Sequence, residues 1–215
     1  MLGMPFDPQA ELLIEERIRP HWSQAGAIVF VTFRTFDSIP KEVIQRWDYE
    51  KNHWIWHLGY PPKHWSELLS TLSEKEQSDF RRHFVRTRED FLDTCQEKCL
   101  LGQQALAEIV GDSLLHFDGD RYRMGDFVVM PNHVHLLAAF ANPDQMRTQF
   151  DSWLHYTAVQ INREISGSGR FWQPEPFDHL VRNSQQYEYL RDYIAKNPQK
   201  ANLPPGQFLY RRYAR

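Results

Sequence analysis

The sequence predicts an α+β protein in which an antiparallel sheet has helices packed on one face. A strand rich in β-branched and aromatic residues runs from Ala27 to Phe36. Mostly helical segments follow, then further apolar strand segments, another helix and a last short strand. This order suits a sheet with helices on one side. With 215 residues the chain can bury a real core, so we predict one domain over residues 1–215.

A mostly helical insertion is predicted between the first strand and Leu114, at about residues 38–112. The segment carries four of the seven tryptophans, Trp47, Trp54, Trp56 and Trp65. Packing of these rings inside a helical subdomain is the better explanation for them. His53 and His57 could form a metal pair at i, i+4, and the tryptophans could stack on unpaired bases. The acidic balance of the segment opposes a DNA contact.

The next predicted element is a buried strand that carries two imidazoles, within Met130–Leu137. Successive strand side chains point to opposite faces, so His133 and His135 share one face and Val134 the other. Two histidines roughly 6–7 Å apart on one strand face can chelate a single metal ion. The alternative is a polar-face coincidence or a pair of hydrogen-bonded core histidines.

A helix from about Met146 to Ile165 follows this strand. Its apolar residues recur at three-and-four spacing and form one buried stripe, centred near Leu154 and Ile161. Tyr156 and Gln160 fall on a different flank and, four residues apart, stack on neighbouring turns. A tyrosine used only for packing would more often sit in the stripe, although an amphipathic tyrosine at a helix margin remains an alternative.

These elements together give the chain a family resemblance. A His-hydrophobic-His strand followed by a helix with Tyr-x-x-x-Gln resembles the HUH single-tyrosine transposases. More narrowly, the chain is similar to the REP-associated tyrosine transposases. The matching segments cover the first strand and most of the chain after about Arg121. They are residues 31–34, 130–137, 156–162, 171–173, 177–182 and 193–198. The resemblance implies a ferredoxin-like antiparallel sheet.

The resemblance also implies the activity and the site residues. Members of this family cleave and rejoin single-stranded DNA beside palindromic hairpins through a 5′-phosphotyrosine intermediate. Tyr156 would be the nucleophile, and His133, His135 and Gln160 would hold Mg²⁺ or Mn²⁺. Tyr189 and Tyr193, four residues apart on the next predicted helix, are the alternatives for the nucleophile, and Tyr193 precedes Asn197 by four. Tyr156 is preferred because its helix directly follows the histidine strand.

The expected partner is single-stranded or hairpin DNA, bound by a monomer or a homodimer. The net charge of −3 does not favour DNA, but residues 146–215 hold ten Lys or Arg against six Asp or Glu, a net of +4. Local fields rather than overall charge attract a phosphate backbone. Each candidate is more often a structural or surface residue than a contact, and Phe171 or Trp172 could stack on a base. The candidates are Arg34, Arg163, Arg170, Trp172, Arg182, Lys196 and Lys200.

Two other functions stay open beside the DNA strand transferase. The chain could bind DNA hairpins without turnover on the same scaffold, or it could be a plain metal-binding α+β protein. A pure binder has no need of two histidines, a tyrosine and a glutamine together, which favours the enzyme. No apolar run approaches the ~20 residues of a membrane span. The acidic N-terminus does not resemble a signal peptide, so a cytoplasmic protein is expected.

Overall fold

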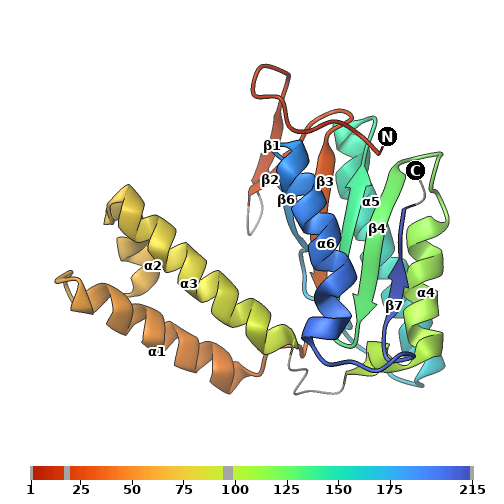
Figure 1. The fold of residues 1–215 in the computed structure, drawn as a ribbon. Helices are drawn as coiled ribbons and strands as arrows, with labels where there is room; N and C mark the ends of the chain where they lie inside the picture. Colours follow the sequence, from red (N-terminus) through yellow and green to blue (C-terminus); the bar gives the residue numbers. More distant parts are fainter. Residues whose placement is uncertain (1, 17–19, 94–98, 214–215) are drawn as a thin grey trace. The chain divides into compact units, whose positions relative to one another are not determined.

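The computed structural model describes residues 2–16, 20–93 and 99–213. The chain divides into two compact units, each of which is seen in Figure 1. We call Met1–Phe36 together with Lys98–Arg215 the core unit, and Asp37–Glu97 the helical unit. Among the described helices, none is long and apolar enough to cross a lipid bilayer.

The core unit is built on a five-stranded sheet in which every neighbouring pair is antiparallel, and this confirms the predicted α+β class. The first four strands in spatial order have the arrangement of a ferredoxin-like sheet, and the fifth extends one edge. A separate two-stranded sheet precedes them in the chain. The spatial order is β6 (Phe177–Leu180), β3 (Ile28–Arg34), β5 (His133–Ala139), β4 (Arg123–Met130) and β7 (Leu209–Arg211), and the separate pair is β1 (Leu13–Glu16) with β2 (Pro20–Ser23).

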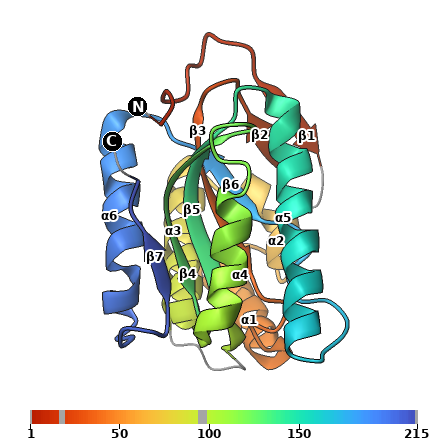
Figure 2. The same cartoon turned by 90° about the vertical axis from the view of Figure 1, so that its right-hand side faces the viewer.

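Helices cover both faces of this sheet, whereas the sequence predicted helices on one face. The crossover helices α4 (Gln104–Leu115) and α5 (Pro143–Glu164) lie on one face, and α6 (Ser184–Lys200) lies on the other, as Figure 2 shows. The reason is the burial of the central strands: every residue of β3 and β5 is buried. A sheet that is buried on both sides needs a covering layer on both.

The alternation of side chains along β5 separates two hydrophobic clusters. Val134, Leu136 and Ala138 pack into the cluster that contains Trp153 and Ile161 of α5. Leu137 and Ala139 pack into the cluster that contains Leu190 and Ile194 of α6. His133 and His135 have the same parity as Leu137, so they face α6.

Polar caps fix where the two long helices of the core unit begin. The side chain of Asn142 accepts a hydrogen bond from the backbone N–H of Asp144, and Pro143 occupies the first turn of α5. Asn183 caps α6 in the same way by accepting from the backbone N–H of Gln186 at 2.7 Å. These caps set the register of the side chains that each helix presents to the sheet.

The helical unit has its own small core. The helical unit consists of α1 (Lys41–His57), α2 (Trp65–Leu68), the 3₁₀ turn η1 (Leu69–Thr71) and α3 (Glu74–Asp93). Trp54 and Trp65 pack against Phe80, which supports aromatic packing as the role of these tryptophans.

The helical unit ends before the boundary of about 112 that the sequence predicted. A short 3₁₀ turn, η2 (Leu100–Gly102), and then α4 follow it. Helix α4 buries Leu106, Val110 and Leu114 in the cluster it shares with β5 and α5, so it belongs to the core unit.

Candidate metal and tyrosine site

Two buried imidazoles of β5 form the base of the candidate site. His133 and His135 are only 1% and 4% exposed, and their ring centroids lie 4.6 Å apart. The Nδ1 atom of His133 lies 2.6 Å from the side-chain oxygen of Asn132, and Nδ1 of His135 lies 2.9 Å from the Thr32 hydroxyl. With Nδ1 donating to these oxygens, each ring keeps the lone pair of Nε2 for another partner.

Helix α6 brings a tyrosine and an asparagine to this pair. Leu190 and Ile194 are buried against the sheet and fix the face that the helix presents. The hydroxyl of Tyr193 lies 3.3 Å from Nε2 of His135, and the two ring centroids are 5.1 Å apart. Asn197, one helical turn later, is 1% exposed and interacts with His133. Tyr193, one of the two alternative nucleophiles, therefore meets the imidazoles together with Asn197, which was not predicted as a ligand.

The side chain of Asn197 is buried without a hydrogen bond of normal geometry. Within the described part of the chain, neither its amide nitrogen nor its carbonyl oxygen has such a partner. A buried polar group left in this state costs about 1–3 kcal/mol. A buried amide in this state next to two imidazoles is suited to act as a ligand for a cation.

Both imidazoles are neutral at physiological pH. Burial lowers the pKa of His133 to about 3, with a further lowering by the positive charge of Arg34, while the contact with Asn197 raises it. Burial also holds the pKa of His135 well below its usual value, and the neighbouring His133 contributes to the same direction. Neutral imidazole is the form that binds metal ions, so the pair is ready to act as a ligand.

The chemistry of the donor set fits a divalent cation. His133 and His135 offer imidazole nitrogens, and Asn197 offers an amide oxygen as the third donor. Within the described residues, no group of three or more His, Cys, Asp or Glu side chains is placed to hold a metal ion. A third donor on this face therefore comes from another type of group, and the buried amide of Asn197 can supply it.

Tyr156 and Gln160 do not join the site, so the prediction that they would meet the imidazoles is wrong. Both lie on α5, which packs against the opposite face of the sheet. Tyr156 is 52% exposed, and together with Gln160 it lines a pocket beside α4. Their spacing placed them correctly on a common flank of one helix. It carried no information on which sheet face that helix covers.

Two of the candidate DNA contacts lie beside the imidazoles. Arg34 pairs directly with His133 across β3 and β5 and is buried, and Lys200 ends α6. The positive charges of both lower the pKa values of the two histidines, which shows that they lie close to the site. A phosphate group placed at the imidazoles would therefore meet two cationic side chains.

The remaining basic candidates lie at the surface of the core unit. Lys196 is exposed on α6 and forms an ion pair of 2.8 Å with Asp192. Arg182 is exposed between β6 and α6, Arg163 is exposed in the last turn of α5, and the Arg170 guanidinium lies 5.4 Å from the ring of Phe36.

Trp172, the predicted stacking residue, is not available for stacking. It is buried, and its indole N–H donates to the hydroxyl of Thr157 at 2.8 Å. Its ring packs against Phe33 within the cluster that α5 covers. The prediction for Trp172 is therefore wrong, and its role is to fill the core.

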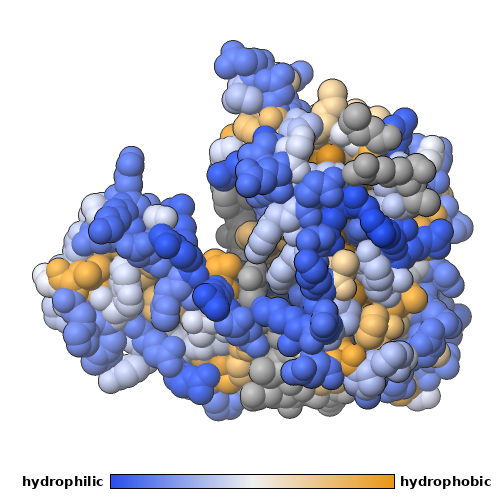
Figure 3. Space-filling model, in the orientation of Figure 1, coloured by the Kyte–Doolittle hydropathy of each residue, from blue (hydrophilic) through white to orange (hydrophobic). Residues whose placement is uncertain are grey.

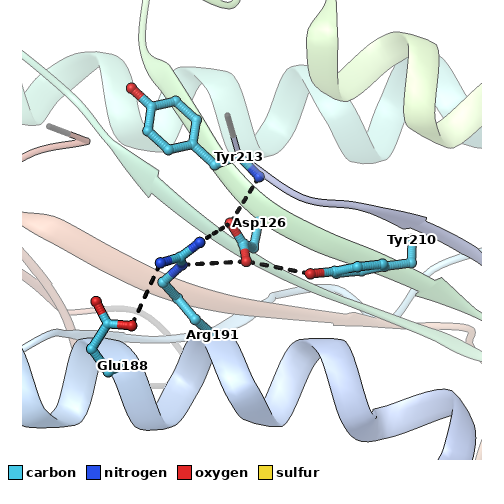
Figure 4. A network of polar contacts seen from close by, with 5 residues as sticks. All are labelled: Asp126, Glu188, Arg191, Tyr210 and Tyr213. Atoms are coloured by element: carbon cyan, nitrogen blue, oxygen red, sulfur yellow. Dashed lines mark hydrogen bonds and ion pairs between the residues drawn. The ribbon is translucent and has the colours of Figure 1, made fainter. Parts of the chain in front are cut away.

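A buried ion pair anchors the helix that carries Tyr193 (Figure 4). The guanidinium of Arg191 on α6 lies 3.3 Å from the carboxylate of Asp126 on β4, and both side chains are less than 10% exposed. The same carboxylate accepts a hydrogen bond from the backbone N–H of Tyr213 at 2.8 Å and lies 3.5 Å from the Tyr210 hydroxyl. One carboxylate thus ties α6 and the C-terminal strand to the sheet, two residues before Tyr193.

The outer surface on the α6 side is mainly hydrophilic, as Figure 3 shows for the core unit. Tyr189, one turn before Tyr193, is 66% exposed, and its ring stacks at 6.5 Å from that of Tyr193. Tyr193 itself is half-buried. Part of the Tyr193 side chain is therefore open to solvent, and the imidazoles lie buried beneath it.

Comparison with known proteins supports the resemblance that the sequence motifs indicated. The chain is 25% identical over 128 residues to the REP-associated tyrosine transposase of Escherichia coli (strain K12), covering 57% of this chain and 73% of the relative. A solved structure of a REP-associated tyrosine transposase bound to a REP hairpin aligns over 86% of this chain and 73% of its own, with 15% identity and a TM-score of 0.43. No family model matches the chain.

Proposed function

We propose that this chain is a metal-dependent single-strand DNA endonuclease and strand transferase that acts beside palindromic hairpin elements. The observation that carries the proposal is the meeting of Tyr193 and Asn197 with the imidazoles of His133 and His135. This arrangement joins a phenol nucleophile to a three-donor metal site on one face of the sheet. The similarity to a REP-associated tyrosine transposase supports the same function.

His133, His135 and Asn197 would hold Mg²⁺ or Mn²⁺. Such an ion supplies Lewis-acid stabilisation of the charge on a phosphate oxygen during phosphoryl transfer. Imidazole donors favour Mn²⁺ over Mg²⁺ in affinity, because Mg²⁺ prefers oxygen ligands. Arg34 and Lys200, whose charges act on both imidazoles, are cationic and oppose a bare cation. We therefore expect metal and DNA phosphate to strengthen the binding of each other.

Tyr193 is the proposed nucleophile. Its phenol oxygen attacks the scissile phosphorus and forms a Tyr–O–P bond, while the proton of the phenol passes to solvent. The bond from phosphorus to the 3′ oxygen breaks, and that oxygen leaves with the electron pair and takes up a proton to give a 3′-hydroxyl. The 5′-phosphotyrosine link conserves the phosphodiester, so attack by a 3′-hydroxyl can rejoin the strand without ATP.

The hydrogen bond between Tyr193 and His135 has a consequence for this chemistry. The phenol O–H lies at Nε2 of His135, which is the nitrogen that would bind a metal. One lone pair cannot accept the phenol proton and bind a cation at the same time. Binding of a metal ion at Nε2 would thus free the phenol oxygen from its hydrogen bond to His135, so that it could attack the phosphate.

The proposal is tested by incubating the protein with an oligonucleotide that contains a hairpin and a 5′ single-stranded flank, in the presence of Mn²⁺ or Mg²⁺. We expect a covalent protein–DNA adduct that survives denaturing electrophoresis and is absent when EDTA is added. An adduct that forms equally well in EDTA would refute the metal site. Hairpin binding with no adduct under any metal condition would favour the second function, a catalytically quiet hairpin-binding protein.

A further inference from the structure

A pocket lined mostly by polar residues lies between α4 and α5, on the face of the sheet opposite to Tyr193. Its volume is about 400 Å³, within the range of small-ligand sites. Residues at three-and-four spacing on each helix form its two walls. From α4 and the turn after it come Ile109, Asp112, Ser113, His116 and Phe117, and from α5 come Gln149, Ser152, Tyr156 and Gln160.

The polar side chains of this pocket have no hydrogen-bond or ion-pair partners among the residues that the structure describes. Within the described part of the chain, none of these seven side chains makes a hydrogen bond or an ion pair. They are Asp112, Ser113, His116, Gln149, Ser152, Tyr156 and Gln160. Helix-surface residues commonly bond to a neighbour one turn away, as Gln104 does with Glu108 at 2.9 Å. The polar side chains that line the pocket make no such contacts, so their donors and acceptors are available to a ligand in the pocket.

Gln149 is the most informative member of this wall. Its side chain is buried, with only 3% of the residue exposed, yet its amide makes no hydrogen bond to the described residues. The polar atoms of its side chain are not completely enclosed by the protein. Since Gln149 lines the pocket, their remaining exposure is toward the pocket. An amide that is buried on all sides but one, and unpaired, indicates a ligand with a matching donor and acceptor.

The lining residues define the chemistry of that ligand. Two primary amides, Gln149 and Gln160, offer adjacent donors and acceptors, and Asp112 offers a carboxylate acceptor. The rings of Phe117 and Tyr156 offer apolar faces. The lining contains one formal negative charge and no Lys or Arg, so a phosphate group is disfavoured. The complementary ligand is a flat, uncharged heterocycle with amino groups on its edge.

We infer that this pocket binds a nucleobase with an exocyclic amino group, as adenine, cytosine and guanine have. Amide side chains pair with the edge of adenine, carboxylates accept from the amino group of cytosine, and aromatic rings stack on base faces. Thymine lacks an amino group and leaves Asp112 without a donor. The base can come from a free nucleoside or from an unpaired position of a DNA strand. In the second case the inference rests on the proposed function.

The first experiment titrates the full chain with single nucleosides by isothermal calorimetry. Deoxyadenosine or deoxycytidine should bind about tenfold more tightly than thymidine, the difference that one matched base-edge contact supplies. Gln149→Leu and Tyr156→Ala should each weaken that binding by about tenfold. Gln145→Leu is the matched control, because Gln145 is exposed on the same helix and does not line the pocket. If Gln149→Leu fails to fold, Gln160→Leu replaces it, since Gln160 is half-exposed.

The second experiment identifies the source of the base. Hairpin oligonucleotides with a flank of adenines, of thymines or of abasic sites are compared for binding to the native chain and to Tyr156→Ala. Tighter binding of the adenine flank that is lost in Tyr156→Ala assigns a strand base, whereas binding of nucleosides alone assigns a free nucleoside. The inference is overturned if no nucleoside and no flank binds, or if Gln149→Leu and Tyr156→Ala bind like the native chain. Nucleoside binding needs no cleavage, so its result is independent of adduct formation.

Discussion

The two faces of the sheet carry the same helical spacing with different surroundings. On α6, Tyr193 precedes Asn197 by four residues, and on α5, Tyr156 precedes Gln160 by four residues. The α6 pair meets two buried neutral imidazoles, and Asn197 is 1% exposed. The α5 pair lines an open polar pocket, and Tyr156 is 52% exposed.

This difference shows which part of the site the local spacing determines. An i, i+4 pair shares one helix flank wherever the helix packs. Whether that flank meets His133 depends on the parity of residues along β5 and on the sheet face that each helix covers. Val134 and Leu136 turn toward α5, so His133 and His135 turn toward α6. The two tyrosine motifs therefore lie on opposite faces of the same sheet.

The largest expected effect distinguishes the two tyrosines as nucleophiles. Tyr193→Phe should reduce covalent adduct formation by roughly 10³-fold or more, since removal of a nucleophile takes away most of the rate enhancement. The matched change on the other face, Tyr156→Phe, should alter it by less than about twofold. Quantitative gel analysis of the adduct over time measures both. Equal losses in the two variants would remove the distinction between the faces.

The next effect concerns the amide donors. Asn197→Ala should weaken Mn²⁺ binding by at least about tenfold, because it removes one of three donors. Gln160→Ala, the matched change on α5, should leave Mn²⁺ affinity unchanged when hairpin DNA is saturating, because Gln160 offers no donor on the face of His133 and His135. Calorimetry or Mn²⁺ electron paramagnetic resonance measures the affinity in the presence of hairpin DNA. A loss of metal binding in Gln160→Ala but not in Asn197→Ala would reverse our assignment.

A third effect concerns how firmly the active helix is held. Arg191→Met leaves the buried carboxylate of Asp126 without its cation and should lower the free energy of unfolding by about 3–5 kcal/mol. Arg163→Met, an exposed arginine on α5, should change it by less than about 0.5 kcal/mol. Urea denaturation followed by circular dichroism measures both. Similar stabilities would show that the ion pair does not anchor α6.

The smallest effect tests the competition between the phenol and the metal for His135. Tyr193→Phe removes the hydrogen bond to Nε2, which is worth about 0.5–1.5 kcal/mol, and should therefore tighten Mn²⁺ binding by about two- to tenfold. The variant that loses the adduct would thus gain metal affinity. Weaker Mn²⁺ binding in Tyr193→Phe would instead show that the phenol supports the metal.

Much of the core and half of the site could be predicted from sequence. The strand with His133 and His135, their common face and the flank shared by Tyr156 and Gln160 all follow from backbone periodicity. The predicted C-terminal boundary of the helical unit, at about residue 112, lies too far along the chain. The reason is that α4 continues a helical pattern, and the sequence alone does not assign α4 to either unit. Trp172 was predicted as a DNA contact, but it is buried and its indole N–H donates to the hydroxyl of Thr157.

The choice of tyrosine could not be predicted because it depends on long-range packing. Chain order favoured Tyr156, whose helix directly follows the histidine strand. That helix is a crossover connection between β5 and β6 and shares its face with α4, whereas α6 crosses the opposite face after β6. The local signal for Tyr193 and Asn197 was present in the same i, i+4 spacing. Only the sheet order and the strand parity decide between them.

Peptide mapping of the trapped adduct tests the central assignment most directly. The protein is reacted with hairpin DNA and Mn²⁺, digested with nuclease and trypsin, and examined by mass spectrometry. We predict that the nucleotide remnant is on the tryptic peptide of residues 192–196, which contains Tyr193 as its sole tyrosine. A remnant on the peptide of residues 148–163, which contains Tyr156, would contradict the account.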